Sequence, residues 1–316
     1  MGVNLLALAR YTLKGPFQAA TVVGLLAVLA VFVPLMVPNS VFGIMIATLF
    51  TMLSCTLVGL IILTQGSVSG LKAIGVSVLG ITLVAWIVVQ TPELGLWTAL
   101  VQWMPIIILA QTLRSSKSLA LTLLVGVLIG AIGIAAQYLI WTDLEINWIS
   151  LALERMSQAE QQQQALVERN IQLIRLFVLA LIAMAYLIFV LIVLSARWLQ
   201  ARVAESDGFG NEFRALSLGK PAATLALALV LLSLWIRQPW LNSLAFLVTI
   251  GFMFQGIAVV HDKLLARKRT RFILGLFYAL LLIFPQVVAL TSITGLIDNW
   301  LVFRKKPAGP NDINLN

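Results

Sequence analysis

Long stretches without a charged residue limit most strongly what this chain can fold into. No Asp, Glu, Lys or Arg occurs between Lys14 and Lys72, which leaves room for two helical bilayer crossings of roughly 20 residues each. Only helices and closed barrels satisfy their backbone polar groups in lipid. The sequence therefore predicts an all-α, polytopic helical membrane protein with about nine transmembrane helices. The seven further gaps are 73–92, 94–113, 118–142, 176–196, 221–236, 238–261 and 272–297.

Composition agrees with this fold class, because 10% of the residues are charged and 61% are hydrophobic, whereas soluble domains carry about 25% charged residues.

Two gaps differ from simple crossings. Residues 221–236 reach about 24 Å at the helical rise, so Arg237 would extend its charge toward water. Pro285 interrupts 272–297 and removes a helical hydrogen bond. The alternative to nine crossings is therefore eight plus a re-entrant last segment.

Lysine and arginine gather in short loops on one side of the predicted membrane. With a cytoplasmic N-terminus and nine crossings, fourteen bases lie inside and seven outside. Because cytoplasmic loops favour Lys and Arg, we expect a multi-pass protein of the bacterial cytoplasmic (inner) membrane, N-terminus inside. A fold-back at Pro285 would bring 304–306 inside and change the tally to seventeen against four. The +9 net charge thus reflects orientation, and no nucleic acid is expected as a partner.

The chain is expected to divide into four parts. These are an N-terminal membrane half of five crossings, an extracytoplasmic helical linker, a C-terminal membrane half of four crossings and a polar tail. The linker contains no Gly or Pro and is rich in the helix formers Glu, Gln, Ala and Leu. Its QQQQ run is typical of a solvated helix face. The respective ranges are 1–141, 142–170, 171–303 and 304–316.

Residues for catalysis or metal binding do not come together in the sequence. A zinc site requires several His or Cys ligands, and the chain has one of each, His261 and Cys55. His261 follows an apolar run, where an interfacial role is expected and pH sensing is the alternative. The Gly-containing loop 207–213 lacks the Lys-Ser/Thr of a phosphate loop. We therefore expect neither an enzyme, nor a metal, nor a cofactor.

Amides and tryptophans within the crossings mark a candidate binding site. Interhelical hydrogen bonds explain amides in membrane helices, and an interfacial belt explains tryptophans near the outer side. The alternative is a pocket between crossings in the outer half, because tryptophan can stack on a planar or cationic solute and intramembrane polar groups are often functional. The candidate ligand-binding residues are Trp86, Gln102, Trp103, Gln137 and Gln255.

Small residues spaced four apart predict close helix packing. Ala20 and Gly24 form one such pair, and Gly126 and Gly130 form a second. Small residues on one helical face let two backbones approach. Packing within the chain is one use, and docking to a separate membrane subunit is the alternative.

Three C-terminal stretches carry a family resemblance: GNEFRALSLGKP, FQGIAVVHDKLLARKRTR and FPQVVALTSITGLIDNWLVFRKK. They combine a Gly-x-x-x-x-His segment before a basic loop, a late proline, and a Gly-Leu-x-Asp-x-Trp ending before Arg-Lys. Over about 200–306 the chain resembles the YybS-like family of bacterial multi-pass membrane proteins, for which no activity is established. The matching residues are Gly256, His261, Pro285, Gly295, Leu296, Asp298, Trp300 and Arg304.

The resemblance implies a distant relation to substrate-binding membrane components of energy-coupling-factor transporters, which bind a small solute and dock a coupling subunit. It implies no ligand residues. We therefore expect a transporter-type, solute-binding membrane component without its own ATPase, with the bilayer, a small-molecule solute, and a membrane coupling subunit or ATPase as partners. The alternative is a membrane scaffold or assembly factor that binds partners through the basic cytoplasmic loops 197–220 and 262–271.

Overall fold

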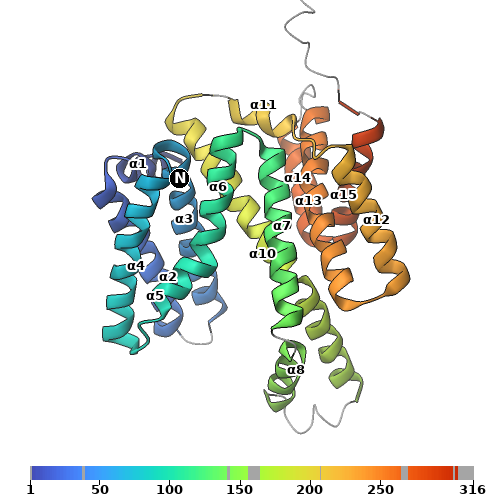
Figure 1. Ribbon diagram of the computed structural model, residues 1–316, viewed down its shortest axis with the longest axis horizontal. Coiled ribbons are helices and arrows are strands. Elements are labelled where there is room, and N and C mark those ends of the chain that lie inside the picture. The colour runs from blue at the N-terminus through green and yellow to red at the C-terminus, as the bar shows by residue number, and fades with distance from the viewer. Residues whose placement is uncertain are drawn as a thin grey trace, which may run out of the picture. The chain divides into compact units, whose positions relative to one another are not determined.

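The computed structural model describes residues 2–37, 40–140, 143–155, 164–206, 208–264, 270–301 and 303–304, and all regular structure within them is helical (Figure 1). Most helices begin and end close to the edges of the charge-free gaps. Their bounds are α1 Gly2–Thr12, α2 Pro16–Met36, α3 Val41–Gln65, α4 Ser67–Val89, α5 Leu94–Trp97, the π-helical turn η1 Thr98–Trp103, α6 Met104–Ser116, α7 Leu119–Leu139, α8 Leu144–Arg155, α10 Gln164–Val203, α11 Gly208–Arg214, α12 Lys220–Ile236, α13 Pro239–Leu264, α14 Thr270–Ile283 and α15 Pro285–Leu301.

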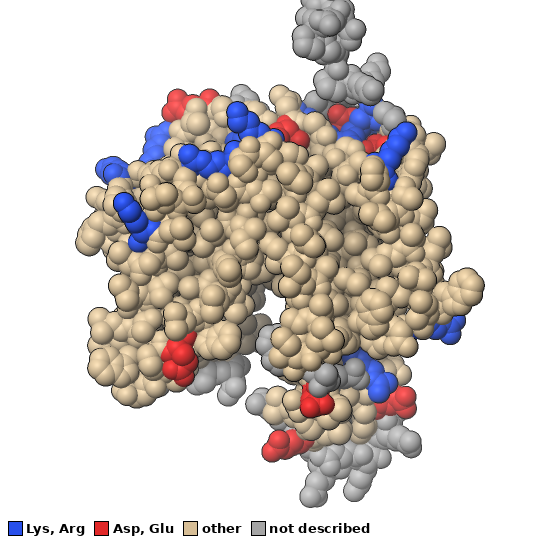
Figure 2. Space-filling view, viewed as in Figure 1, with Lys and Arg blue, Asp and Glu red and all other residues tan. Residues whose placement is uncertain are grey.

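Among the described residues, seven helices are long and apolar enough to cross a membrane, or eight if α14 and α15 together form one span. This agrees with a multi-pass membrane protein, and the count of nine is not confirmed. Helix α12 is shorter, with 17 residues, as its narrow charge-free gap suggested. The uncharged middle of each unit described below is visible on the face shown in Figure 2.

The last apolar run is broken rather than continuous. Helix α14 ends at Ile283, α15 begins at Pro285, and the two axes are bent by 114°. Proline has no N–H to donate to the preceding turn, so the helix does not continue through this point. A bend of this size makes the segment a broken span or a re-entrant loop. The second of these is the alternative that Pro285 suggested.

The helices form two compact units. The first contains residues 1–126 and 188–212, and the second contains 127–187 and 213–316. This division differs from the predicted halves, 1–141 and 171–303, because α7 and α10 each contribute to both units. With 40 residues, α10 is about 60 Å long. The predicted linker 142–170 contains α8 and the first turns of α10, and its residues 156–163, with most of the QQQQ run, lie outside the described part of the chain.

Helix α3 is the central element of the first unit. It packs against α2, α4 and α6, and α2 also packs along α4. The Ser77 hydroxyl donates to the carbonyl of Ala20 at 3.0 Å, and a Cβ added at Gly24 would lie 3.6 Å from Ser77. The Ala20 and Gly24 face therefore packs against α4. The Ser54 hydroxyl similarly joins α3 to the carbonyl of Val23 in α2, at 3.1 Å.

Helix α13 is the central element of the second unit, and its closest neighbour is α15. The two backbones touch at a pair of glycines. A Cβ added at Gly295 would lie 2.1 Å from the Phe252 carbonyl oxygen, and one added at Gly256 would lie 1.9 Å from the Thr291 carbonyl oxygen. Neither site has space for any side chain. Gly130 of α7 packs less closely, since its added Cβ would meet the end of the Leu247 side chain at 2.8 Å.

A buried polar network closes one end of the second unit. Asp298, 5% exposed, accepts hydrogen bonds from the side chains of Gln255 and Arg304. Arg304 also donates to the carbonyl of Arg214. Asn299 accepts from the backbone N–H of Gly219 at 3.0 Å. The network therefore fixes the end of α15 beside the polypeptide that leads into α12.

The same network shows at which end of the second unit α15 ends. Arg304 contacts Arg214, whose neighbour Phe213 packs edge-on against His261 near the end of α13. The end of α15 thus lies at the same end of the second unit as the C-terminal turn of α13. In the predicted topology this is the cytoplasmic end, as expected for a fold-back at Pro285.

Single cysteines tested with a membrane-impermeant maleimide would check this arrangement in intact cells. The only native cysteine, Cys55, is buried, so the background is low. We expect Lys263→Cys and Asn311→Cys to be protected together, while Asn147→Cys in the extracytoplasmic segment reacts. Reaction of Asn311→Cys with Lys263→Cys still protected would contradict the shared side.

Candidate functional site

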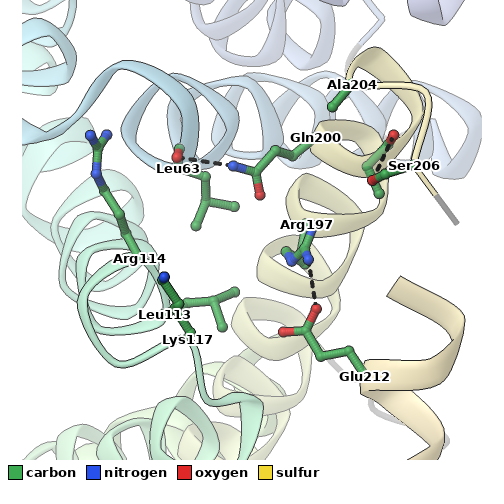
Figure 3. A pocket seen from close by; sticks show the side chains of 10 residues that line it. Leu63, Leu113, Arg114, Lys117, Arg197, Gln200, Ala204, Ser206 and Glu212 are labelled. Carbon is green, nitrogen blue, oxygen red and sulfur yellow. Dashed lines mark hydrogen bonds and ion pairs between the residues drawn. The ribbon is translucent and has the colours of Figure 1, made fainter. Parts of the chain in front are cut away.

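The first unit has a cavity of about 560 Å³ where α3, α6 and α10 end. Small-molecule sites usually occupy about 300–1,000 Å³, so the volume fits a small ligand. Figure 3 shows Arg114 and Lys117 on one side of the cavity and Arg197, Gln200 and Glu212 on the other. The remaining lining residues are Leu63, Leu113, Ala201, Ala204 and Ser206.

Two side chains hold the end of α3 in the cavity wall. Arg114 donates from Nη1 to the carbonyl of Ile62 at 2.7 Å, and Gln200 donates from Nε2 to the carbonyl of Leu63 at 3.0 Å. The last carbonyls of a helix have no partner within the helix. Arg114 and Gln200 satisfy two of these carbonyls. They thereby connect α6 and α10 to α3 at the same level and fix the cavity wall.

The cavity carries more positive than negative charge. Arg197 pairs with Glu212 at 2.8 Å, and both side chains are roughly a fifth exposed. Arg114 and Lys117 have no carboxylate within ion-pair distance in the described part of the chain. Three cations therefore face one carboxylate, which favours an anionic ligand. Arginine can bind a carboxylate or phosphate with two parallel hydrogen bonds, and lysine adds a point charge.

Local sequence explains how these side chains reach the cavity. Arg197, Gln200 and Ala201 follow an i, i+3, i+4 spacing, which places them on one face of α10, and Ala204 continues this spacing in the turn just after the helix. Small alanines on this face leave space between the longer side chains. Lys117 ends α6 in the left-handed conformation, with a φ of 52°. This turn reverses the chain into α7.

The five predicted ligand residues are divided between the two units. Trp86, Gln102 and Trp103 belong to the first unit, and Gln137 and Gln255 belong to the second. Trp86 is exposed, whereas Trp103 is fully buried and its indole N–H has no hydrogen-bond partner among the described atoms. Trp103 ends the π-helical turn η1, and π-turns occur frequently at functional sites.

The amides of the second unit are bonded within the protein. Gln137 donates to the carbonyl of Val178 at 3.1 Å. Gln255 is fully buried, accepts from the backbone N–H of Leu218 at 2.9 Å and donates to Asp298 at 3.0 Å. Both amides therefore make interhelical hydrogen bonds. These bonds were one of the two explanations for amides in the crossings, and contact with a solute was the other. Neither residue lines a cavity described here.

The residues of the family resemblance lie along α13 and α15 or just after α15, and only Asp298 and Arg304 belong to the polar network itself. Gly256 and Gly295 form the backbone contact, Asp298 and Arg304 form the ion pair, and Pro285 breaks the helix. His261 hydrogen-bonds to the Tyr278 hydroxyl at 2.7 Å. Trp300 is exposed, and Leu296 lines a second cavity.

The cationic residues of the cavity were interpreted from the sequence only as determinants of orientation. Arg114 and Lys117 are three residues apart, and Arg197 and Gln200 repeat this spacing. The cationic residues of the cavity all lie close to the end of an apolar run. This is the one feature of the sequence that could have indicated that they belong to one site. This feature does not show which helices are neighbours in the fold, because positions 63, 114 and 197 are far apart in the chain.

Among the described residues, no three His, Cys, Asp or Glu side chains lie close enough together to hold a metal ion. Comparison of the chain with protein-family models, with curated proteins and with solved structures finds no match.

Proposed function

We propose that the protein is a transporter-type, solute-binding component of the membrane, and that its ligand is a small anion held in the basic cavity of the first unit. The observation that supports this is the convergence of Arg114, Lys117 and Arg197 on a cavity of about 560 Å³. The binding region that we propose therefore lies at the base-rich helix ends, in contrast to the outer half proposed from the sequence.

The chemistry of the cavity favours a phosphate or carboxylate group. A ligand with two negative charges would balance the excess of two positive charges left by the Arg197–Glu212 pair. The cavity lies at the ends of three helices, so the anionic group could arrive on a free solute or on a lipid headgroup. Basic pockets between membrane helices bind anionic headgroups, and both sources share the same charged contacts.

Removing one cation tests the proposal. We expect Lys117→Asn to weaken binding of inorganic phosphate or glycerol phosphate about tenfold, which corresponds to about 1.4 kcal/mol. Asparagine is chosen because it tolerates the left-handed backbone that Lys117 adopts. The measurement is the ligand-dependent rise in melting temperature of the purified protein, which follows the affinity for the folded state.

The matched control is Lys72→Gln, which removes an exposed charge from the first unit away from the cavity lining. This variant should bind as the wild type does. Stabilisation by glycerol phosphate but not by vesicles of an anionic phospholipid would indicate a free solute, and the reverse would indicate a headgroup. If neither stabilises the protein, or if both variants weaken binding equally, the cavity is not the binding site.

Active transport would require an external energy source, and a membrane coupling subunit or ATPase is the partner that we propose. The alternative is a membrane scaffold that binds partners through 197–220 and 262–271. The concentration of basic side chains at one end of the first unit (Figure 2) favours it for residues 197–212, which belong to that unit. Residues 265–269 lie outside the described residues. Mass spectrometry of co-purifying proteins separates the two, since ATPase subunits support a transporter and assembly proteins alone support a scaffold.

The YybS-like resemblance gives the same class of function, a membrane component related to solute-binding subunits. We propose no catalytic role and no cofactor. The bacterial inner membrane with a cytoplasmic N-terminus remains the proposed location, because it places most lysines and arginines on the cytoplasmic side.

A further inference from the structure

The second unit contains a separate, apolar cavity of about 300 Å³ between α12, α13 and α15. Ala226 and Val230 line it from α12, Phe252 from α13, and Ala289 from α15. A cavity of about 150 Å³ lined by Leu, Ile and Phe can hold a benzene molecule. Twice that volume accommodates a segment of one hydrocarbon chain, but not a whole lipid.

The walls offer almost no free hydrogen-bonding group to an occupant. The two hydroxyls in the lining are bonded to their own helices. Thr249 donates to the carbonyl of Ala245 at 2.7 Å, and Ser292 donates to the carbonyl of Val288 at 2.8 Å. A polar solute would lose its hydration here without replacement, at a cost of a few kcal/mol per unpaired group. The occupant must therefore be apolar where it contacts the cavity.

The cavity has a mouth toward the lipid-facing surface. Leu227 and Ile293 line it and are 40% and 50% exposed. Leu225 and Leu290, next to the lining in sequence, are also exposed. The lining therefore continues into an apolar surface on α12 and α15, from which a chain in the bilayer can enter.

The position of the cavity along α12 indicates what lies above it. Lys220, exposed in the first turn of α12, is six residues before Ala226, a distance of about 9 Å along the helix. The headgroup region is about 5–7 Å thick on each side of a hydrocarbon core of about 30 Å. If Lys220 lies among the headgroups, the cavity begins at the depth of the upper acyl chain.

The start of α12 is held in place. The N–H groups of Leu218 and Gly219 donate to Gln255 and Asn299 at 2.9 and 3.0 Å. Lys220 therefore begins its helix at a fixed level above the cavity. A cation at this level attracts the negative surface charge of an anionic leaflet.

We propose that the second unit binds one anionic phospholipid, with an acyl chain in the cavity between α12, α13 and α15 and its phosphate toward Lys220. The site is distinct from the basic cavity of the first unit and does not depend on it. The bound lipid would fill the space that α12, α13 and α15 leave open in the second unit.

Native mass spectrometry of the protein, extracted in mild detergent from membranes of mixed phospholipids, tests the site. We expect the wild type to retain one phospholipid, enriched in anionic headgroups. Ala289→Trp should fill the mouth of the cavity and reduce retention severalfold. Ala289 is exposed, so the larger side chain need not disturb the fold. Lys220→Gln should retain a lipid but lose the preference for anionic headgroups.

Leu290→Trp is the matched control, because Leu290 is the next residue and is 63% exposed outside the lining. It should retain lipid as the wild type does. Equal retention by Ala289→Trp and Leu290→Trp would overturn the proposal. So would a wild type that carries no phospholipid, one that carries an apolar molecule of another class, or one without an anionic preference. Phosphate-dependent stabilisation of the first unit is measured separately, so failure of either site does not decide the other.

Discussion

Replacing Gly295 with alanine is expected to destabilise the second unit by about 3 kcal/mol or more. Its Cβ would lie 2.1 Å from the Phe252 carbonyl oxygen and 2.6 Å from the Gly256 nitrogen. Both are backbone atoms, so no side-chain rotation can relieve the overlap, and α13 and α15 must separate. Overpacking in a close-packed interior typically costs 1–3 kcal/mol, and more when the surroundings cannot adjust. The melting temperature in detergent measures the effect.

Gly275→Ala provides the control for this variant. Gly275 lies in α14 of the same unit, and a Cβ added there meets no atom within 4 Å. Alanine is a better helix former than glycine by about 1 kcal/mol, so this change should be neutral or slightly stabilising. Equal melting temperatures for the two alanine variants would show that the backbones of α13 and α15 do not touch at Gly295.

Asp298→Ala is expected to cost about 3–5 kcal/mol, because removing one partner leaves a largely buried guanidinium without its carboxylate. The Arg304 and Asp298 side chains are 13% and 3% exposed. The Gln255 amide and the Phe303 N–H would lose their acceptor as well. Denaturant unfolding in detergent gives the free energy, and impermeant labelling of Asn311→Cys reports whether the tail changes side.

The double variant Asp298→Ala/Arg304→Met separates two contributions to the lost stability. One is the cost of leaving a buried charge unpaired, and the other is the loss of the attraction between Asp298 and Arg304. Replacing both members of a buried ion pair with apolar groups is often far less costly than removing one. We expect the second substitution to recover a large part of the lost stability. If it adds a further loss of similar size, the hydrogen bond from Arg304 to the Arg214 carbonyl stabilises the unit more than the ion pair does.

The helices could be predicted well from the sequence, because their signal is local. The gap between Lys14 and Lys72 contains two helices, and each of the seven other gaps matches a helix or a broken helix. Both the short α12 and the interruption at Pro285 were visible as irregular cases. The angle at Pro285 could not be predicted, because proline permits a break without setting its direction. The Asp298–Arg304 pair and the close approach of Gly295 to α13 hold α15 in place, and the His261–Tyr278 hydrogen bond connects α14 to the same helix α13.

The candidate site could be predicted only in part. Gln255 was predicted to contact a solute, but the structure shows it bonded to Asp298, which is 43 positions away. Nothing in the local pattern distinguishes such an internal bond from a solute contact. Arg114, Lys117 and Arg197 were interpreted as loop charges, because the local pattern also does not distinguish a charge that sets orientation from one that lines a cavity. Their convergence depends on which helix ends are neighbours, and that is a property of packing rather than of composition.

The length of α10 has a practical consequence for single-particle imaging of this protein. A hydrocarbon core of about 30 Å covers only half of a helix of 40 residues. Its N-terminal turns are accompanied by α8 through the edge-on contact between Trp148 and Phe177, whose ring centroids are 5.7 Å apart. Small membrane proteins often lack a feature outside the detergent micelle by which single particles can be aligned. An antibody fragment raised against α8 and the start of α10 would provide such a feature for aligning the particles.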